Sequence, residues 1–252
     1  MTKLFNVTGL LLFLWQIFPV ISSSGQNSVS DTSFLTKSRA QAYALYTEKI
    51  AEQSPLVNGS EYKEYLTVPE LTTGIPYFIS DDWIDGNVFY DSALYSNVPL
   101  MYDEVTDKLI IEQPFSHYKL ELISEKVNYF EISGHTFLRI VRAKSDSTIS
   151  TGFYDVLYDG KTKAYVKRLK QVIETTQPSG VLINYLDTKR YLLWKDNIYY
   201  PVSRKSSVMK VFEDKRKLLR KLVRDHSSEI DFHNNREKSI ALIARLYDET
   251  EK

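Results

Sequence analysis

Residues 156–166 read VLYDGKTKAYV, and this stretch decides the fold. Two short runs of β-branched and aromatic residues flank Asp159-Gly160, a dipeptide that supplies the positive φ angles of tight hairpin turns. On both sides of it, from Tyr77 to about Val202, apolar and polar residues alternate with the period of half-buried strands. The sequence therefore predicts an antiparallel β domain, built as a meander, over residues 77–202.

Two further hairpins support the meander. One is expected over residues 130–141, around the turn Ser133-Gly134, and the other over residues 191–200, around Asp196-Asn197. Both turns consist of residues that tolerate the backbone conformation of a tight hairpin. Hairpin counting gives a sheet of roughly eight to ten short strands.

The regions before and after the meander have helical rather than alternating spacing. Residues 26–76 are interpreted as an N-terminal helix over 38–53 and a connector broken up by Pro69, Gly74 and Pro76. After Pro201 an apolar stripe predicts one helix from Ser206 or Ser207 to Val223, followed by a second helix. These two should form a helical hairpin over residues 203–252 that packs on the β domain. The expected fold class is α+β.

The first 25 residues have the anatomy of a secretory signal peptide. Lys3 precedes an apolar run, and small residues ending at Gly25 follow it. The run is shorter than the roughly 20 apolar residues that span a bilayer, so no transmembrane segment is expected after cleavage. We therefore expect an exported protein, periplasmic or extracellular.

Composition narrows the chemistry. The 252 residues contain 32 basic and 32 acidic side chains and no cysteine. Disulfides, thiolate metal sites and cysteine nucleophiles are thereby excluded, and a zero net charge gives no overall attraction to nucleic acid. No nucleotide-binding, lipase-type or HExxH motif occurs in the sequence. The four histidines lack neighbours at metal-ligand spacing, and His117 and His135 are interpreted as polar surface. We therefore expect no metal, no cofactor and no catalytic residue that can be named.

Two groups of residues are candidates for binding. Aromatic side chains recur beside the hairpin turns and could grip a glycan or a protein partner in the cell envelope, although a role in the core is the commoner one. Basic residues crowd the first C-terminal helix, where three readings are open: a solvated face, a patch for an anionic partner or membrane surface, or a contact with nucleic acid, which export disfavours. The aromatic candidates are Tyr90, Tyr95, Tyr158, Tyr165, Trp194 and Tyr199, and the basic patch comprises Lys215, Arg216, Arg220 and Lys221.

Several segments also resemble a group of uncharacterised secreted proteins from Bacteroidetes. The segments that carry the resemblance are residues 86–91, 97–103, 132–137, 152–160 and 195–202, together with the basic C-terminal helices. That group has no established activity to transfer, so the resemblance implies export and a single-domain architecture.

A non-enzymatic binding or envelope-associated module is the leading functional hypothesis. It follows from the missing catalytic motifs together with the aromatic hairpins. The alternative is a secreted hydrolase whose carboxylates converge only in the fold, because sequence alone does not place two acids at catalytic separation.

Overall fold

A computed structural model describes residues 37–38, 55–65, 71–113, 116–143 and 148–250. The chain divides into two units, Met1–Tyr46 and Thr47–Lys252. The first unit is described only at Lys37 and Ser38, which are helical. The predicted signal peptide and nearly all of the predicted N-terminal helix therefore lie outside the described residues. The second unit is described below.

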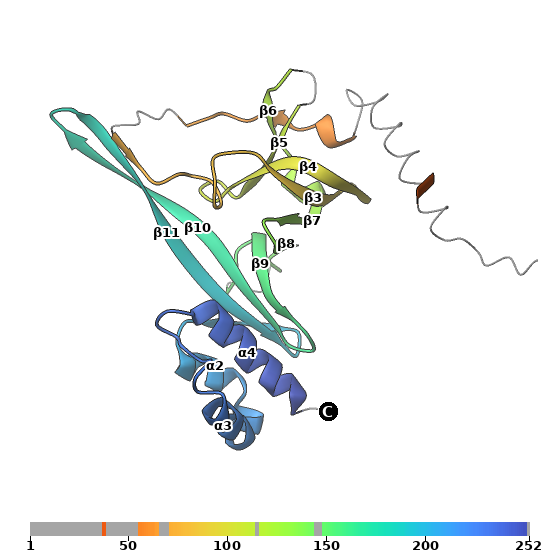
Figure 1. Ribbon diagram of the computed structural model, residues 1–252, viewed down its shortest axis with the longest axis vertical. Helices are drawn as coiled ribbons and strands as arrows, with labels where there is room; N and C mark the ends of the chain where they lie inside the picture. Colours follow the sequence, from red (N-terminus) through yellow and green to blue (C-terminus); the bar gives the residue numbers. More distant parts are fainter. Residues whose placement is uncertain (1–36, 39–54, 66–70, 114–115, 144–147, 251–252) are drawn as a thin grey trace, which may run out of the picture. The chain divides into compact units, whose positions relative to one another are not determined.

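The second unit is a mixed α+β fold dominated by one large sheet (Figure 1). Within the described residues the sheet has 12 strands, more than hairpin counting predicts. Their bounds are β1 Ser60–Glu61, β2 Thr72–Thr73, β3 Ile84–Tyr90, β4 Ala93–Asp103, β5 Lys108–Glu112, β6 Lys119–Glu121, β7 Val127–Ile132, β8 His135–Ile140, β9 Gly152–Asp159, β10 Lys163–Gln177, β11 Gly180–Lys195 and β12 Ile198–Val202.

The strand order is β1-β6-β5-β4-β3-β7-β8-β9-β10-β11-β12, with β2 paired to β11. All these neighbours are antiparallel except β2 and β11, which are parallel. Strands β7 to β12 follow one another as a meander, whereas β3 to β6 run outward from β3 in the opposite direction. Both β1 and β2 lie in the stretch that the sequence predicts to be a connector.

The three predicted β-hairpins are present, but their turns differ. Ser133 and Gly134 have φ angles of 50° and 76°, and Asp196 and Asn197 have φ angles of 52° and 61°, as the two-residue turns require. Gly160 has no positive φ, so the predicted reason for its occurrence is wrong. A Cβ there would lie 2.4 Å from a carboxylate oxygen of Asp248, so the glycine is needed for close approach.

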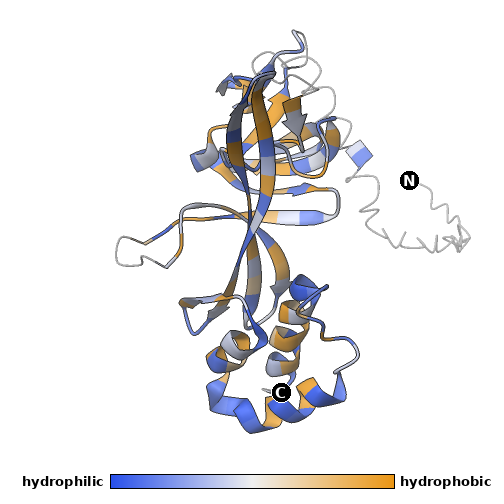
Figure 2. Cartoon of the chain, turned by 90° about the vertical axis from the view of Figure 1, so that its left-hand side faces the viewer, coloured by the Kyte–Doolittle hydropathy of each residue, from blue (hydrophilic) through white to orange (hydrophobic). Residues whose placement is uncertain are grey.

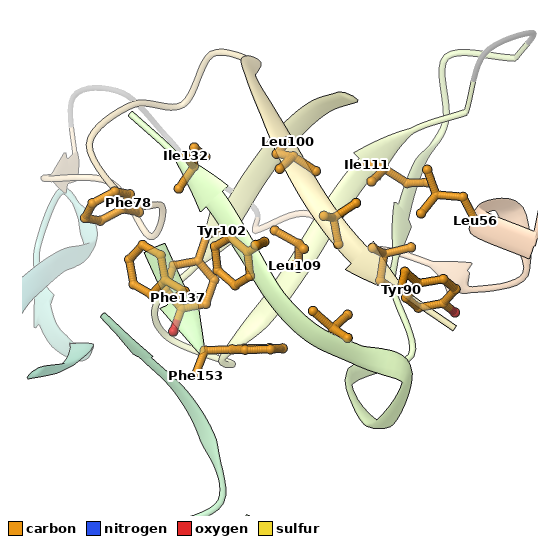
Figure 3. Close-up of a cluster of buried hydrophobic side chains, with 14 of the residues drawn as sticks. Leu56, Phe78, Tyr90, Leu100, Tyr102, Leu109, Ile111, Ile132, Phe137 and Phe153 are labelled. Carbon is orange, nitrogen blue, oxygen red and sulfur yellow. The ribbon is translucent and has the colours of Figure 1, made fainter. Parts of the chain in front are cut away.

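The first buried cluster lies between β3, β4, β5, β7 and β8 (Figure 3). Its centre is aromatic: Tyr102, Phe130 and Phe137 are fully buried, and the last two stack with ring centroids 4.8 Å apart. The Tyr102 hydroxyl donates to Asp107 at 2.7 Å, which satisfies the polar end of a buried ring. The alternation of side chains along each strand places these residues on one face of the sheet.

Three α-helices follow the sheet in the described residues: α2 Lys205–Val211, α3 Arg216–Asp225 and α4 Arg236–Glu249. The sequence predicts a single helix over the region of α2 and α3, and this is wrong. A 3₁₀ turn, Glu213–Lys215, divides it. Phe212 before the turn stacks on Tyr247 of α4 at 4.3 Å, and Asp214 accepts a 2.6 Å hydrogen bond from the Tyr247 hydroxyl. These contacts fix the break.

The helices cover one face of the sheet at its β9–β12 end. Ile240, Ile243 and Leu246 of α4 form a second buried cluster with Val166 of β10 and Leu193 of β11. A third cluster lies on the other face of the same strands, around Tyr165 and Leu192. Figure 2 shows the apolar and polar bands that alternate along the long β10–β11 hairpin. No helix of the described residues has the length and apolar character needed to cross a membrane.

Candidate functional site

The six aromatic candidates do not form one site. Tyr90 is fully buried in the first cluster, against which Tyr95 also packs. Tyr158 packs on the second cluster, and its hydroxyl donates to Asp248 at 3.1 Å. Each of these three side chains has a structural partner of its own.

The other three candidates gather on the face of the sheet opposite the helices. Tyr165 is buried in the third cluster, while Trp194 and Tyr199 pack against it and remain partly exposed. The rings of Tyr165 and Tyr199 have centroids 6.4 Å apart, and the ammonium of Lys163 lies 5.9 Å above the Trp194 ring. Burial raises the pKa of Tyr165, as expected for a phenol enclosed by apolar groups.

The basic candidates lie on α3 and on the turn before it, and they divide into two pairs. Lys215 donates to the carbonyl oxygen of Thr250 at 3.2 Å, and Arg216 pairs with Glu213 at 3.1 Å. Arg220 and Lys221 are exposed and form no ion pair with the described residues. The first pair stabilises the local structure, and the second pair is available for a partner.

Two more cations extend this available pair. Lys217 and Arg224 are exposed, and with Arg220 and Lys221 they stand at positions i, i+3, i+4 and i+7 of one helix. The opposite side of α3 holds Leu219 and Val223, which are buried. We call Lys217, Arg220, Lys221 and Arg224 the α3 stripe. Their spacing in the sequence would have identified all four.

A buried chain of charges links the sheet to α4. Asp155 on β9 is 1% exposed and accepts from Arg168 on β10, whose guanidinium also contacts Glu237 on α4 at 2.8 Å. Lys189 on β11 donates to the same Glu237 at 2.8 Å, and His135 on β8 contacts Asp155 at 2.8 Å. The interpretation of His135 as plain polar surface is therefore wrong. Its ring is partly exposed, but its Nδ1 contacts the buried carboxylate of Asp155.

The pKa shifts within this chain of charges follow its contacts. Burial by itself would raise the pKa of Glu237, but hydrogen bonds from Arg168 and Lys189 outweigh burial and hold that pKa below its usual value. For Arg168, burial opposes the charge while Glu237 and Asp155 favour it, and the net pKa is raised. Both side chains are therefore charged at neutral pH, and each one stabilises the charged form of the other.

A depression lies where β12 ends and β11 continues without it. Strand β12 ends at Val202, opposite Tyr191, whereas β11 extends back to Gly180. The space measures about 250 Å³. We call it the edge depression, and the lining residues that matter below are Ile149, Leu192, Pro201, Lys189, Arg190 and Arg236. A second hollow, which shares Lys189 and Arg236 with it, lies beside the start of α4.

Acidic side chains of the described residues do not converge in these hollows. Burial raises the pKa of Glu104, although Lys170 nearby lowers it; the Lys170 ammonium lies 3.5 Å from the Glu104 carboxylate. Lys170 also donates to the carbonyl oxygens of Ile75 and Tyr77, so it holds a loop in place. No group of three or more acids and histidines in the described part of the chain is arranged to hold a metal ion.

Comparison of the chain with protein-family models, curated proteins and solved structures gives no match.

Proposed function

We propose that the protein is an exported, non-enzymatic binding module that associates with an anionic surface of the cell envelope through the α3 stripe. The single observation that carries this proposal is the stripe itself. Four cations share one exposed face of α3, and within the described residues no acid pairs with any of them. Each basic residue close to an anionic membrane contributes about 1 kcal/mol of binding, so four can act together.

The surroundings of α3 support a docking role rather than a simple solvated face. The apolar side of the helix packs on α4, so the stripe is presented on a helix whose orientation is fixed. Leu218, on the flank of the stripe, is 49% exposed. Because the whole chain has zero net charge, any strong attraction to an anionic surface has to come from such a local concentration of charge.

Co-sedimentation with phospholipid vesicles tests the proposal. The chain from Gln26 onward, without the predicted signal peptide and its apolar run, should sediment with vesicles of phosphatidylglycerol and phosphatidylcholine, and not with phosphatidylcholine alone. Raising the salt concentration should release it, because exposed charges are screened. The double substitution Arg220→Glu and Lys221→Glu should abolish sedimentation.

The matched control is Lys63→Glu with Arg142→Glu, which changes the net charge equally at two exposed positions outside the helices. This control should sediment like the unmodified chain. Equal loss in both double variants would mean that overall charge rather than the stripe is responsible, and the proposal would then fail. Binding to a soluble anionic polysaccharide with no binding to the vesicles would also contradict it.

A further inference from the structure

We infer that the edge depression binds a small organic carboxylate with an apolar body, at a site separate from the α3 stripe. The depression exists because β12 is shorter than its hairpin partner β11. After Val202 the chain leaves the sheet, and the amides of Ser203 and Arg204 donate to the hydroxyl of Ser207 on α2 at 3.0 and 3.1 Å. The edge of β11 at Lys189 and Arg190 is thereby left without a neighbouring strand in the described structure.

The polar side of the depression is cationic. Its lining contains Lys189, Arg190 and Arg236, and no acid. The side chain of Arg190 is exposed and makes no hydrogen bond or ion pair with the described residues. Arg236 uses one nitrogen, Nε, to donate to the carbonyl oxygen of Phe232 at 3.3 Å, which leaves its remaining donors for a ligand. A guanidinium group suits the planar, bidentate geometry of a carboxylate, and the lining contains two such groups.

The nearest acid does not cancel this charge. Glu237 follows Arg236 on α4, but its carboxylate is engaged by both Arg168 and Lys189. Arg168 and Lys189 supply two positive charges, and Asp155 and Glu237 supply two negative charges. These four side chains therefore balance one another. Arg190 and Arg236 are outside this balance and are the excess positive charge at the depression.

The other side of the depression is apolar. Ile149 and Leu192 are 5% and 4% exposed, and Pro201 lies across from Leu192 in the β11–β12 ladder. Pro201 is exposed, so an inorganic anion would leave it uncovered, whereas an organic acid would cover it and pair its carboxylate with arginine. The volume is just below the range of roughly 300–1,000 Å³ for drug-sized ligands, so the occupant is small.

The orientation of Arg236 is supported by packing. The Arg236 guanidinium lies 5.8 Å from the centroid of the Tyr191 ring, and Tyr191 is itself buried beneath α4. The Tyr154 hydroxyl donates to the carbonyl oxygen of Ser150 at 2.8 Å, which fixes the loop that forms the far wall. Arg236 and this wall are therefore in place before a ligand arrives, which reduces the entropy cost of binding.

Hexanoate, hexan-1-ol and inorganic phosphate are the probes, each titrated into the ¹⁵N-labelled full chain and followed by NMR. Hexanoate should shift the amide resonances of Ser150, Leu192 and Arg190, while the alcohol and phosphate should bind at least about tenfold more weakly, because each lacks one half of the recognition. Equal binding of hexanoate and hexan-1-ol, or of hexanoate and phosphate, would overturn the inference without any variant.

Substitutions then locate the site. Arg190→Gln and Arg236→Gln are at exposed positions and should each weaken hexanoate binding by about tenfold, the loss expected for a charged hydrogen bond. Arg224→Gln, a matched change on the α3 stripe, should leave hexanoate binding unchanged. Retention of full affinity in the double variant Arg190→Gln with Arg236→Gln would refute the site. The variant Arg220→Glu with Lys221→Glu should still bind hexanoate, so this test and the vesicle test fail independently.

Discussion

Arg168 is the side chain at which three elements meet. From β10 it donates to Asp155 on β9 and to Glu237 on α4, and its own side chain is 8% exposed. Replacing it with methionine would keep most of the buried volume but remove the guanidinium that both acids share, leaving Asp155 with His135 and Glu237 with Lys189. Breaking a buried pair in this way costs about 3–5 kcal/mol, so we expect Arg168→Met to lose that much unfolding free energy in urea.

The control for this change is Arg220→Met on the exposed face of α3, which should change the unfolding free energy by less than about 0.5 kcal/mol. A loss of similar size in both variants would mean that methionine itself, rather than the broken ion pair, is responsible.

Glu237 should make the stability depend on pH. Its pKa in the folded protein lies below the usual value of 4.5, so the deprotonated acid stabilises the fold. A group of this kind contributes fully above its unfolded pKa, and the contribution is lost as pH falls through the folded pKa. Between about pH 6 and about pH 3, unfolding free energy should therefore fall more steeply in the natural chain than in Glu237→Gln. Urea titrations at several pH values measure this, and parallel curves would contradict it.

At the scale of elements, α4 fixes the β9–β10 turn as well as covering the sheet. The Asp248 carboxylate accepts from the amide and hydroxyl of Thr162, at 3.0 and 2.9 Å, and from Tyr158. Asp248→Ala would leave the buried Thr162 amide without an acceptor, at a cost of about 1–3 kcal/mol. Faster hydrogen exchange at Thr162 would report the loss, whereas Asp225→Ala at the exposed end of α3 should leave that amide unchanged.

The same contacts explain what the sequence could and could not predict. Alternation identifies the strands that bury a single face, and turn residues such as Asp196-Asn197 identify the hairpins. The first part of β10 is buried on both faces, at residues 164–168, so burial does not alternate there. The division of the predicted first C-terminal helix depends on Tyr247, more than thirty residues away from Phe212 and Asp214. Likewise, the role of Gly160 depends on Asp248. Local patterns contain no information about such distant partners.

The candidate sites differ in the same way. The α3 stripe can be predicted from the sequence, because its four cations recur at helical spacing within one helix. The edge depression is not, because Ile149, Arg190 and Arg236 come from three separate segments of the chain. The pattern around His135 gives no sign of Asp155, which lies twenty residues further along on the neighbouring strand. Residues that are far apart in the sequence meet at these sites only because of the order in which the strands pair.

For the whole second unit, the sheet should make the separate buried clusters unfold together. Strands β7 to β10 are paired without a gap, and Asp155, Arg168 and Glu237 connect them to α4. Trp83 and Trp194 pack against different clusters, so they report on two ends of this sheet. Two variants each retain one of them: Trp15→Phe with Trp194→Phe, and Trp15→Phe with Trp83→Phe.

Because one continuous ladder joins the two reporters, we expect their fluorescence transitions in urea to have the same midpoint as the far-ultraviolet circular dichroism transition of the same variant. Circular dichroism also controls for any stability change that the substitutions introduce. If the Trp83 and Trp194 transitions differed from their circular dichroism transitions in opposite directions by more than about 0.5 M urea, the clusters would unfold separately. The Arg168→Met change, made in both variants, should lower the two midpoints together, since it removes the ionic connection between the sheet and α4 but leaves the strand ladder between the two reporters intact.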